Sequence, residues 1–255
     1  MKIVVVGGTG LIGSALVDRL RELGHQVVPA SRSTGVDIAT GTGLAEALQG
    51  ADIVIDASNA RSDDPVEMLN FFRHAGRVLL DAAKRAGVKH HVTLSMLGAD
   101  RLSLSGFFLA KLTQENLVRT SGLPYTILRS APFFETIYGI ANDADGGADT
   151  GTDLRLPPIP MQPLAAGDVA MALADAALSP PANTVLEIAG PETFPLTELA
   201  LDVLAAFEDN RQVTPDPRAL YFGAEVGPEK LVAENPWRVG NTRFDDWLRD
   251  CVANV

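Results

Sequence analysis

A glycine-rich segment near the start of the chain has the residue types and spacing of a phosphate-binding loop. It spans residues 7–13, reads GGTGLIG, and stands between a β-branched apolar run and an amphipathic stretch. Glycine tolerates positive φ and lets the backbone come within hydrogen-bonding distance of a pyrophosphate, which the positive end of a following helix also attracts. This context predicts that the segment binds a dinucleotide. The expected contacts are Gly7, Thr9, Gly10, Leu11, Ile12 and Gly13.

The residues after the second predicted strand, 26–29, bear on which dinucleotide is bound. In parallel α/β sheets that bind a dinucleotide, the carboxyl end of the second strand reaches the adenosine ribose. An acidic residue there would bind both ribose hydroxyls and repel a 2′-phosphate, whereas an arginine attracts the phosphate. The chain has Ser31, Arg32 and Ser33 at this place. We therefore expect these residues to contact NADP(H), with NAD(H) less favoured; the alternative is that Arg32 is a solvated loop residue.

The elements that must position these residues alternate between strand and helix through the first half of the chain. Continuous apolar runs such as residues 3–6 predict strands buried on both faces of a parallel sheet. Asp64 and Pro65 have the residue types of an N-cap and first position of a long helix. The alternation predicts an α/β fold, a Rossmann-type doubly wound parallel sheet. The predicted strands cover residues 3–6, 26–29, 51–56, 91–95 and 125–129, and the predicted helices cover 11–23, 66–86 and 106–121.

The second half is richer in proline and glycine, with PPIPMQP at residues 157–163 and GPETFP at 190–195. Helices are still predicted at 167–178 and 196–207, with a strand at 185–189 between them. We interpret residues 1–255 as one domain, in which 1–130 form the dinucleotide-binding core. Residues 131–255 are expected to form mostly substrate-side segments, a small C-terminal subdomain.

Composition narrows the class of partner. The formal net charge is −11 and no run of lysines or arginines forms a basic stripe, so nucleic acid is not an expected partner. No apolar run reaches the roughly 20 residues of a membrane span, so we expect a cytoplasmic protein without a membrane partner. The one cysteine, Cys251, allows no cysteine-based metal cluster, and we expect no metal. A small-molecule substrate is expected, and a homodimer is left open.

The spacing of Gly7, Gly10 and Gly13 resembles the extended and atypical branches of the short-chain dehydrogenase/reductase superfamily, over nearly the whole chain. AKLTQENLVRTSGLPYTILR at residues 110–129 and YTILRSAPFF at 125–134 are similar to the active-site helix, following strand and nicotinamide-side loop of its NmrA-like group. The resemblance implies further cofactor contacts. Asp37 and Ile38 would bracket the adenine, Ala57, Ser58 and Asn59 would line the far side, and Pro132 and Phe133 would lie at the nicotinamide, where Phe133 and Phe134 would wall an apolar pocket.

The same resemblance assigns the catalytic positions. A typical member uses a serine, a tyrosine and a lysine, the tyrosine four residues before the lysine. Ser95 and Lys111 stand at the serine and lysine positions, and both would also contact the cofactor, but Phe107 occupies the tyrosine position and cannot donate a proton. Residues 108–111 (FLAK) also resemble the Phe-x-x-Lys of the isoflavone-reductase-like branch, in which the lysine itself transfers the proton. Tyr138 and Tyr221 either reach the pocket or serve as packed aromatics.

Two functions remain open on the sequence. In the first, the protein is an NADPH-dependent reductase of a carbonyl, enone or quinone-like molecule, with Lys111 or water supplying the proton. In the second, it is a dinucleotide-binding sensor or regulator without turnover, as NmrA-like regulators are thought to be. Retention of both Ser95 and Lys111 in register favours the enzyme.

Overall fold

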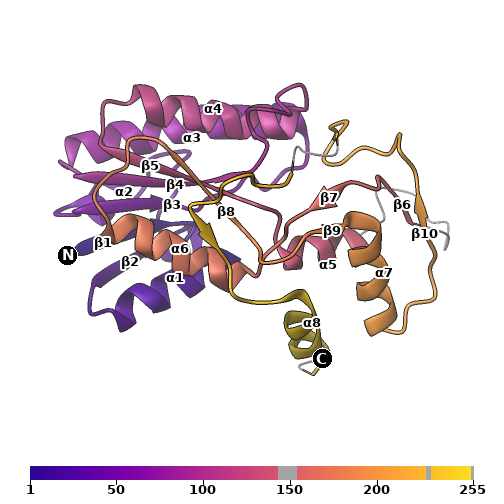
Figure 1. The fold of residues 1–255 in the computed structure, drawn as a ribbon. Coiled ribbons are helices and arrows are strands. Elements are labelled where there is room, and N and C mark those ends of the chain that lie inside the picture. Colours follow the sequence, from indigo (N-terminus) through magenta and orange to yellow (C-terminus); the bar gives the residue numbers. More distant parts are fainter. Residues whose placement is uncertain (143–153, 228–230, 254–255) are drawn as a thin grey trace.

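The computed structural model describes residues 1–142, 154–227 and 231–253, and its centre is a seven-stranded sheet (Figure 1). Each pairing within this sheet is parallel. β1 is buried on both faces because the run Ile3–Val6 offers apolar side chains in both directions. The strands are β1 (Lys2–Val6), β2 (Gln26–Ala30), β3 (Ile53–Asp56), β4 (His90–Met96), β5 (Tyr125–Ser130), β8 (Val185–Ala189) and β11 (Arg238–Val239).

The strand order, β11-β8-β5-β4-β3-β1-β2, creates a crevice at one end of the sheet. From β1 the chain pairs with β2 on one side and later returns to pair with β3 on the other, so Ile3 lies between Val27 and Ile53. In such a doubly wound sheet the connections after β1 and β3 leave in opposite directions, and the gap between them opens at the carboxyl ends of the strands. This confirms the predicted fold class.

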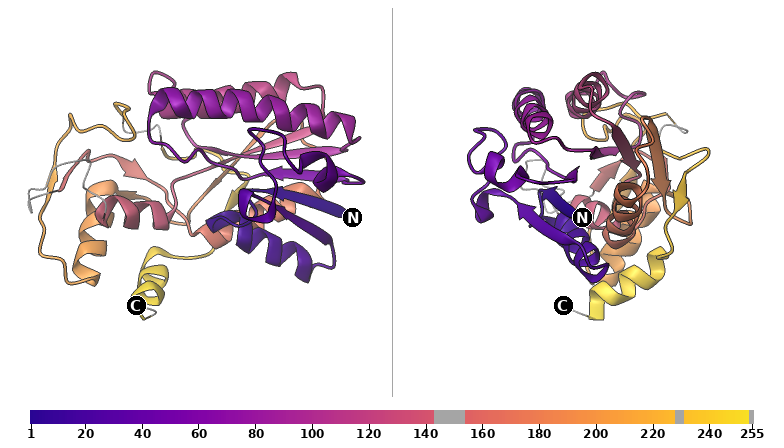
Figure 2. Two further views of the ribbon diagram at one scale, coloured as in Figure 1. Left: turned by 180° about the vertical axis from the view of Figure 1, so that it is seen from behind. Right: turned by 90° about the vertical axis from the view of Figure 1, so that its left-hand side faces the viewer.

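Helices cover both faces of the sheet. α3 (Pro65–Arg85) and α4 (Gly106–Thr120) lie side by side on one face, and α1 (Leu11–Glu22) and α6 (Ala166–Leu178) lie on the other (Figure 1; Figure 2, right). α1 turns Ile12, Leu16 and Leu20 inward at helical spacing, which places it against the sheet. The short α2 (Leu44–Leu48) packs at the β2 edge beside α3.

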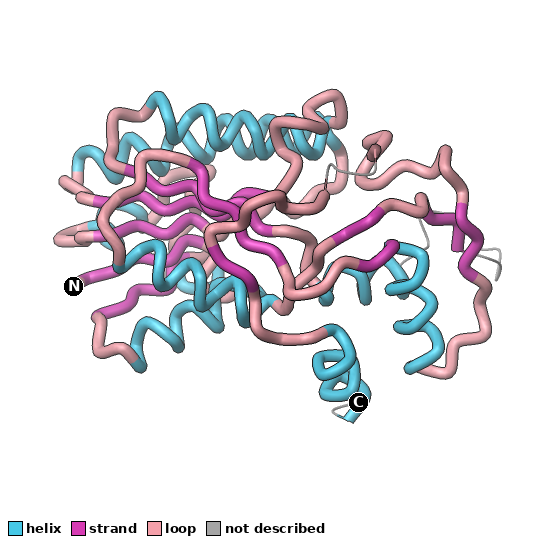
Figure 3. Tube along the Cα trace, viewed as in Figure 1, coloured by secondary structure: helices cyan, strands magenta, loops and turns pink. Residues whose placement is uncertain are grey.

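A second lobe lies beyond the carboxyl ends of the strands (Figure 1; Figure 3). Its own core is rich in aromatic residues, including Phe134, Phe244 and Trp247. β6 pairs in parallel with β10, and β7 pairs antiparallel with β9. The lobe consists of α5 (Phe134–Asn142), β6 (Leu154–Leu156), β7 (Pro160–Met161), β9 (Phe194–Pro195), α7 (Leu196–Ala206), β10 (Val213–Pro215) and α8 (Phe244–Ala253).

The C-terminal half contributes to both lobes, since α6, β8 and β11 join the central sheet while the other late elements do not. The elements predicted in the first half occur with their bounds shifted by two residues or fewer. The elements that prediction missed are α2, α5, α8 and the strands of two or three residues, which are too short to show a period. No helix in the described ranges is long and apolar enough to cross a membrane.

Asp64 caps α3 as predicted: its Oδ1 accepts hydrogen bonds from the backbone N–H groups of Val66 and Glu67, both at 2.9 Å. Asp64→Ala should lower the free energy of unfolding by about 1 kcal/mol, because those two N–H groups lose their acceptor. Asp64→Asn keeps an acceptor and should lose much less. Urea unfolding monitored by circular dichroism measures both; equal stability of the alanine and wild-type proteins would refute the cap.

Candidate functional site

A single cleft with a volume of about 670 Å³ occupies the carboxyl ends of the central strands. The glycine-rich loop forms one end of it, and a group of aromatic side chains forms the other. β1, β2, β3, β4 and β5 each contribute a residue at or just after the end of the strand: Val6, Ala30, Ala57, Met96 and Ser130. The cleft thus lies at the position that the strand order predicts for a ligand.

The glycine-rich loop depends on the absence of side chains. Gly7 has a φ of +77°, and a Cβ built on it would lie 2.6 Å from the carbonyl oxygen of Ala57 in the turn after β3. A Cβ on Gly13 would overlap the carbonyl of Gly7, so α1 can begin this close to the loop only with glycine there. Gly10 is the N-cap of α1, whose first turn holds no acidic residue. The first N–H groups of the helix, without intrahelical acceptors, point at the cleft as an anion site.

Arg32 lines the cleft just after β2, in a 3-10 turn, Arg32–Thr34, which Ser31 and Thr34 close with reciprocal hydrogen bonds. Its Nε forms an ion pair with Asp37 Oδ2 at 3.2 Å, and Asp37 Oδ1 accepts from the Ala39 N–H. Half of the Arg32 side chain is exposed, so its terminal nitrogens can still meet a phosphate. Ser33 does not line the cleft; its hydroxyl contacts Ser31 and Thr9, which do.

Asp56, at the end of β3, organises the turn on the far side of the cleft. Its Oδ1 accepts hydrogen bonds from the backbone N–H and the hydroxyl of Ser58, at 3.0 and 2.6 Å. Its Oδ2 accepts from the side-chain amide of Gln114 on α4 at 2.8 Å. Asp56 therefore fixes the loop 57–59 to the sheet and to α4, and the three predicted residues Ala57, Ser58 and Asn59 all line the cleft.

Lys111 is a buried lysine that faces the cleft from α4. Its Nζ donates to the Leu94 carbonyl at 2.9 Å and to Gln114 Oε1 at 2.6 Å, and lies 4.6 Å from the ring centre of Phe72. Burial lowers the pKa of Lys111 to about 8, although the charges of Asp56 and Glu115 favour its protonated form. An amine with two of its three N–H groups held and a pKa near neutrality can both bind a hydroxyl and release a proton.

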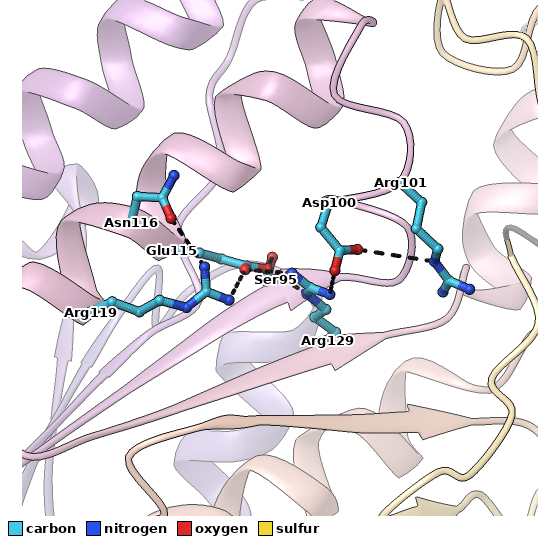
Figure 4. Close-up of polar contacts among 7 residues, drawn as sticks. All are labelled: Ser95, Asp100, Arg101, Glu115, Asn116, Arg119 and Arg129. Atoms are coloured by element: carbon cyan, nitrogen blue, oxygen red, sulfur yellow. Dashed lines mark hydrogen bonds and ion pairs between the residues drawn. The ribbon is translucent and has the colours of Figure 1, made fainter.

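Ser95 lies one residue before the end of β4, beside a buried cluster of charges (Figure 4). Its hydroxyl lies 2.6 Å from Glu115 Oε1, and Glu115 is fully buried. Arg129 binds Glu115 with two nitrogens, at 2.8 and 2.7 Å, and Arg119 binds it at 2.8 Å. Arg129 also pairs with Asp100 at 2.7 Å. Burial opposes the charge on Arg129, but the hydrogen bonds to Glu115 and Asp100 outweigh it and raise its pKa.

Aromatic side chains wall the other end of the cleft. Phe107 stacks on Phe222 with ring centres 4.7 Å apart, and Ser105 holds the Phe222 carbonyl through its hydroxyl at 2.6 Å. Tyr221 also lines the cleft, and burial raises the pKa of its phenol, which keeps it protonated. Phe133 lines the cleft as expected. Phe134 does not: it is buried in the second lobe, against Phe244 and Trp247.

The structure brings the predicted site residues to one cleft, with the exceptions of Ser33 and Phe134. Tyr138, the other tyrosine considered, packs on Phe207 instead. Prediction missed residues whose role depends on tertiary contacts. The burial of the Glu115 carboxylate shows no signal in the sequence, whereas the position of Gln114 on the same helical face as Lys111 was detectable from its spacing. The other cleft residues that prediction missed include Ala60, Arg61, Met68, Phe71, Met96, Thr136 and Phe222.

A family model described as NAD(P)H-binding matches residues 7–180, more than half of the chain. The chain belongs to this family. Membership in the NAD(P)H-binding family confirms the resemblance to atypical short-chain dehydrogenases/reductases and the expected nicotinamide dinucleotide, without separating NADP(H) from NAD(H). The matched range begins at the glycine-rich loop and includes Ser95 and Lys111.

Curated relatives of this NAD(P)H-binding protein carry the description photosystem II assembly factor Ycf39. The protein from Synechocystis sp. is 31% identical over 153 residues, which are 54% of this chain and 47% of the relative. The protein from Cyanophora paradoxa is 28% identical over 153 residues, 54% of this chain and 48% of the relative. The matched region thus spans about half the length of these curated relatives.

Solved structures share the fold of this NAD(P)H-binding protein across most of the chain. UDP-N-acetylglucosamine 4-epimerase from Bacillus cereus has a TM-score of 0.71 at 20% identity, covering 100% of this chain and 97% of its own. The NADPH-dependent quinone oxidoreductase QOR2 from Escherichia coli, in complex with NADPH, has a TM-score of 0.64 at 23% identity, covering 84% and 77%. At these identities the likeness establishes the fold alone.

Gly10 is the glycine at which binding and folding can be separated, because a Cβ there would approach only the Gly7 carbonyl, at 3.3 Å. Gly10→Val should abolish dinucleotide binding while the circular-dichroism spectrum stays native, since the branched side chain fills the space needed by the pyrophosphate. Gly167→Val, in open space on α6, is the matched control and should bind normally. Calorimetric titration with NADP⁺ measures both; wild-type affinity in the Gly10 variant would refute the phosphate-loop assignment.

Proposed function

We propose that the protein is an NADP(H)-dependent reductase of a small, flat, apolar acceptor such as a quinone, an enone or an aromatic ketone. The observation that carries the proposal is the continuity of one cleft, from a phosphate-binding loop to a buried lysine and a wall of aromatic rings. When bound with its pyrophosphate at the glycine loop, the reduced cofactor supplies a hydride. The chain's own residues then have to select the phosphate, orient the acceptor and provide one proton.

Arg32 supports NADP(H) over NAD(H). Both Arg32 and Asp37 line the adenosine end, but Asp37 has each carboxylate oxygen engaged, one by Arg32 and one by the Ala39 N–H. That leaves a guanidinium, half exposed, as the group that meets the 2′-position. A charge-assisted hydrogen bond from its terminal nitrogens fits a phosphate better than a hydroxyl.

Lys111 supports the reductase. The acceptor takes the hydride at carbon, and its oxygen takes a proton from Lys111 Nζ through the N–H that neither Leu94 nor Gln114 holds. The neutral amine regains a proton from solvent. Since the pKa of Lys111 is about 8, the donor is mostly protonated at neutral pH yet acidic enough to react.

The aromatic wall supports a flat acceptor. Phe107, Phe133, Tyr221 and Phe222 offer ring faces and edges at the end of the cleft that also holds Ser95 and Lys111. Flat conjugated molecules gain from stacking on such rings. The QOR2 structure, whose title names an NADPH-dependent quinone oxidoreductase, is consistent with this substrate class on the same fold.

A second function, a dinucleotide sensor or assembly factor without turnover, is favoured by one observation. Phe107 replaces the phenol of a typical reductase, and its ring is stacked on Phe222. No proton-donating hydroxyl therefore faces the acceptor from that position. The description of the Ycf39 relatives as assembly factors is consistent with it. NADPH oxidation with a panel of quinones, enones and aromatic ketones separates the two functions. Tight NADPH binding with no oxidation by any acceptor would establish the sensor.

Lys111 gives the reductase a pH signature. The reduction rate should fall as pH rises through about 8, because the protonated amine is the form that donates. Lys111→Arg keeps the positive charge but has no proton to release near this pH, so it should be slower by roughly 10² and show no inflection near pH 8. Steady-state NADPH oxidation from pH 6.5 to 10 measures both profiles. A wild-type profile that is flat between pH 7 and 9.5 would place the donor elsewhere.

Arg32→Ala should weaken NADPH binding by about tenfold and leave NADH binding within about twofold, because only the 2′-phosphate loses a partner. Arg85→Ala, in the last turn of α3, which leads into the amino end of β4 and does not line the cleft, should change neither affinity. Calorimetric titration at low and high salt measures all three proteins. Equal affinity of the wild type for NADPH and NADH would contradict the assignment of Arg32.

A further inference from the structure

The buried cluster around Glu115 determines which way the hydroxyl of Ser95 points. Glu115 accepts four hydrogen bonds, one from Ser95, two from Arg129 and one from Arg119 (Figure 4). With two guanidinium groups bound to it and no exposed surface, this side chain is an ionised carboxylate. An ionised carboxylate has no hydrogen to donate.

The hydroxyl hydrogen of Ser95 must therefore lie on the line to Glu115 Oε1. The separation of the two oxygens, 2.6 Å, is that of a charge-assisted O–H···O⁻ bond. Ser95 has only one hydrogen, and turning it toward the cleft would leave part of a buried carboxylate without a partner. Among the described residues, none donates a hydrogen bond to Ser95 Oγ, so its lone pairs are available to the cleft that it lines.

We propose that Ser95 acts toward the ligand as a hydrogen-bond acceptor, held in that state by Glu115, and that it selects a ligand group bearing an N–H or O–H. A serine at this position whose proton were free would instead donate to a substrate carbonyl. The proposal rests on the proposed function only in taking the cleft as the place where cofactor and substrate bind. Glu115 is then a positioning residue, because it acts on the ligand through Ser95.

Neighbouring groups strengthen the assignment. Ser130, at the end of the adjacent strand β5, also lines the cleft and likewise donates its hydroxyl internally, to the Ala131 carbonyl at 2.7 Å. Lys111, with one N–H open, is a buried donor of this part of the cleft, as is the protonated phenol of Tyr221. A ligand that presents one acceptor to Lys111 and one donor to Ser95 satisfies both residues, whereas a ligand with acceptors alone leaves Ser95 facing a lone pair.

The donor can come from two sources that share this chemistry. The nicotinamide carboxamide carries an N–H₂ group, and a hydroxylated acceptor carries an O–H. The first source predicts an effect of Ser95 on cofactor affinity. The second predicts an effect on the affinity of the substrate for the protein already saturated with NADP⁺.

Neutron diffraction from crystals of the ligand-free protein grown in D₂O tests the first step directly. The deuteron of Ser95 should lie between its Oγ and Glu115 Oε1. A deuteron that points into the cleft would overturn the proposal. Because no cofactor is present, this result stands whether or not the protein proves to be a reductase.

Two binding arms test the second step. In the first arm, calorimetry compares NADP⁺ with 3-acetylpyridine adenine dinucleotide phosphate, in which a methyl ketone replaces the carboxamide and removes its N–H. In the second, the NADP⁺ complex is titrated with 2-hydroxyacetophenone and with 2-methoxyacetophenone. The wild type should prefer the donor-bearing member of one pair by roughly fivefold, the value of one neutral hydrogen bond. Ser95→Ala should reduce that preference to within twofold.

Ser130→Ala is the matched control and should keep the wild-type preference. A preference lost in the Ser130 variant but kept in the Ser95 variant would overturn the proposal, as would the absence of any Ser95-dependent preference in both arms. Failure of NADP⁺ to bind would refute the proposed function, and the neutron result would still report the direction of the Ser95 hydrogen.

Discussion

The site depends on how closely two turns of backbone approach each other at the end of the sheet. The turn after β1 touches the turn after β3 at Gly7 and Ala57, where no Cβ fits. This contact sets the start of α1 and therefore the direction of its free N–H groups. It also places the turn after Asp56 at the wall of the same cleft, where Gln114 of α4 holds Asp56 through a hydrogen bond. A single methyl group at position 7 would push the turn after β1 away from the turn after β3, and both ends of the cleft depend on that contact.

The part of the cleft around Lys111 and Ser95 is built from buried charged side chains rather than exposed ones. α4 turns Lys111, Gln114 and Glu115 toward the sheet, at the spacing that puts them on one helical face. Each charge has a nearby charge of opposite sign. Asp56 and Glu115 compensate the charge of Lys111, and Arg119 and Arg129 compensate the charge of Glu115. Buried ion pairs contribute little net stability, but they restrict the orientation of neighbouring polar groups. The lowered pKa of Lys111 and the fixed hydroxyl of Ser95 both follow from this arrangement.

Features with a local pattern could be predicted from the sequence, either because apolar residues repeat with the period of a helix or strand or because a motif has a fixed spacing. The strand–helix alternation, the glycine loop, the Asp64 cap and the positions of Ser95 and Lys111 all have local signals. Phe133 in the aromatic wall was expected, but the stacked pair of that wall had no local signal, because Phe222 reaches Phe107 across more than a hundred residues of sequence. Phe134 was misplaced for a related reason: adjacent aromatic residues at the start of α5 point in different directions, one to the cleft and one to the second lobe. Glu115 reads locally as a surface helix residue, and only Arg129 on β5 reveals it as buried.

Because Phe222 stacks on Phe107, the cleft is lined by segments that lie far apart in the sequence. The glycine loop, Arg32 and the 57–59 turn are encoded before position 60, whereas part of the aromatic wall comes from a short turn at 221–224 that pairs with itself and is anchored by the Ser105 hydroxyl. Changes in that turn alter the shape of the aromatic end of the cleft without touching the glycine loop. Editing four codons therefore reshapes one end of the cleft, while the phosphate-loop end is inherited unchanged.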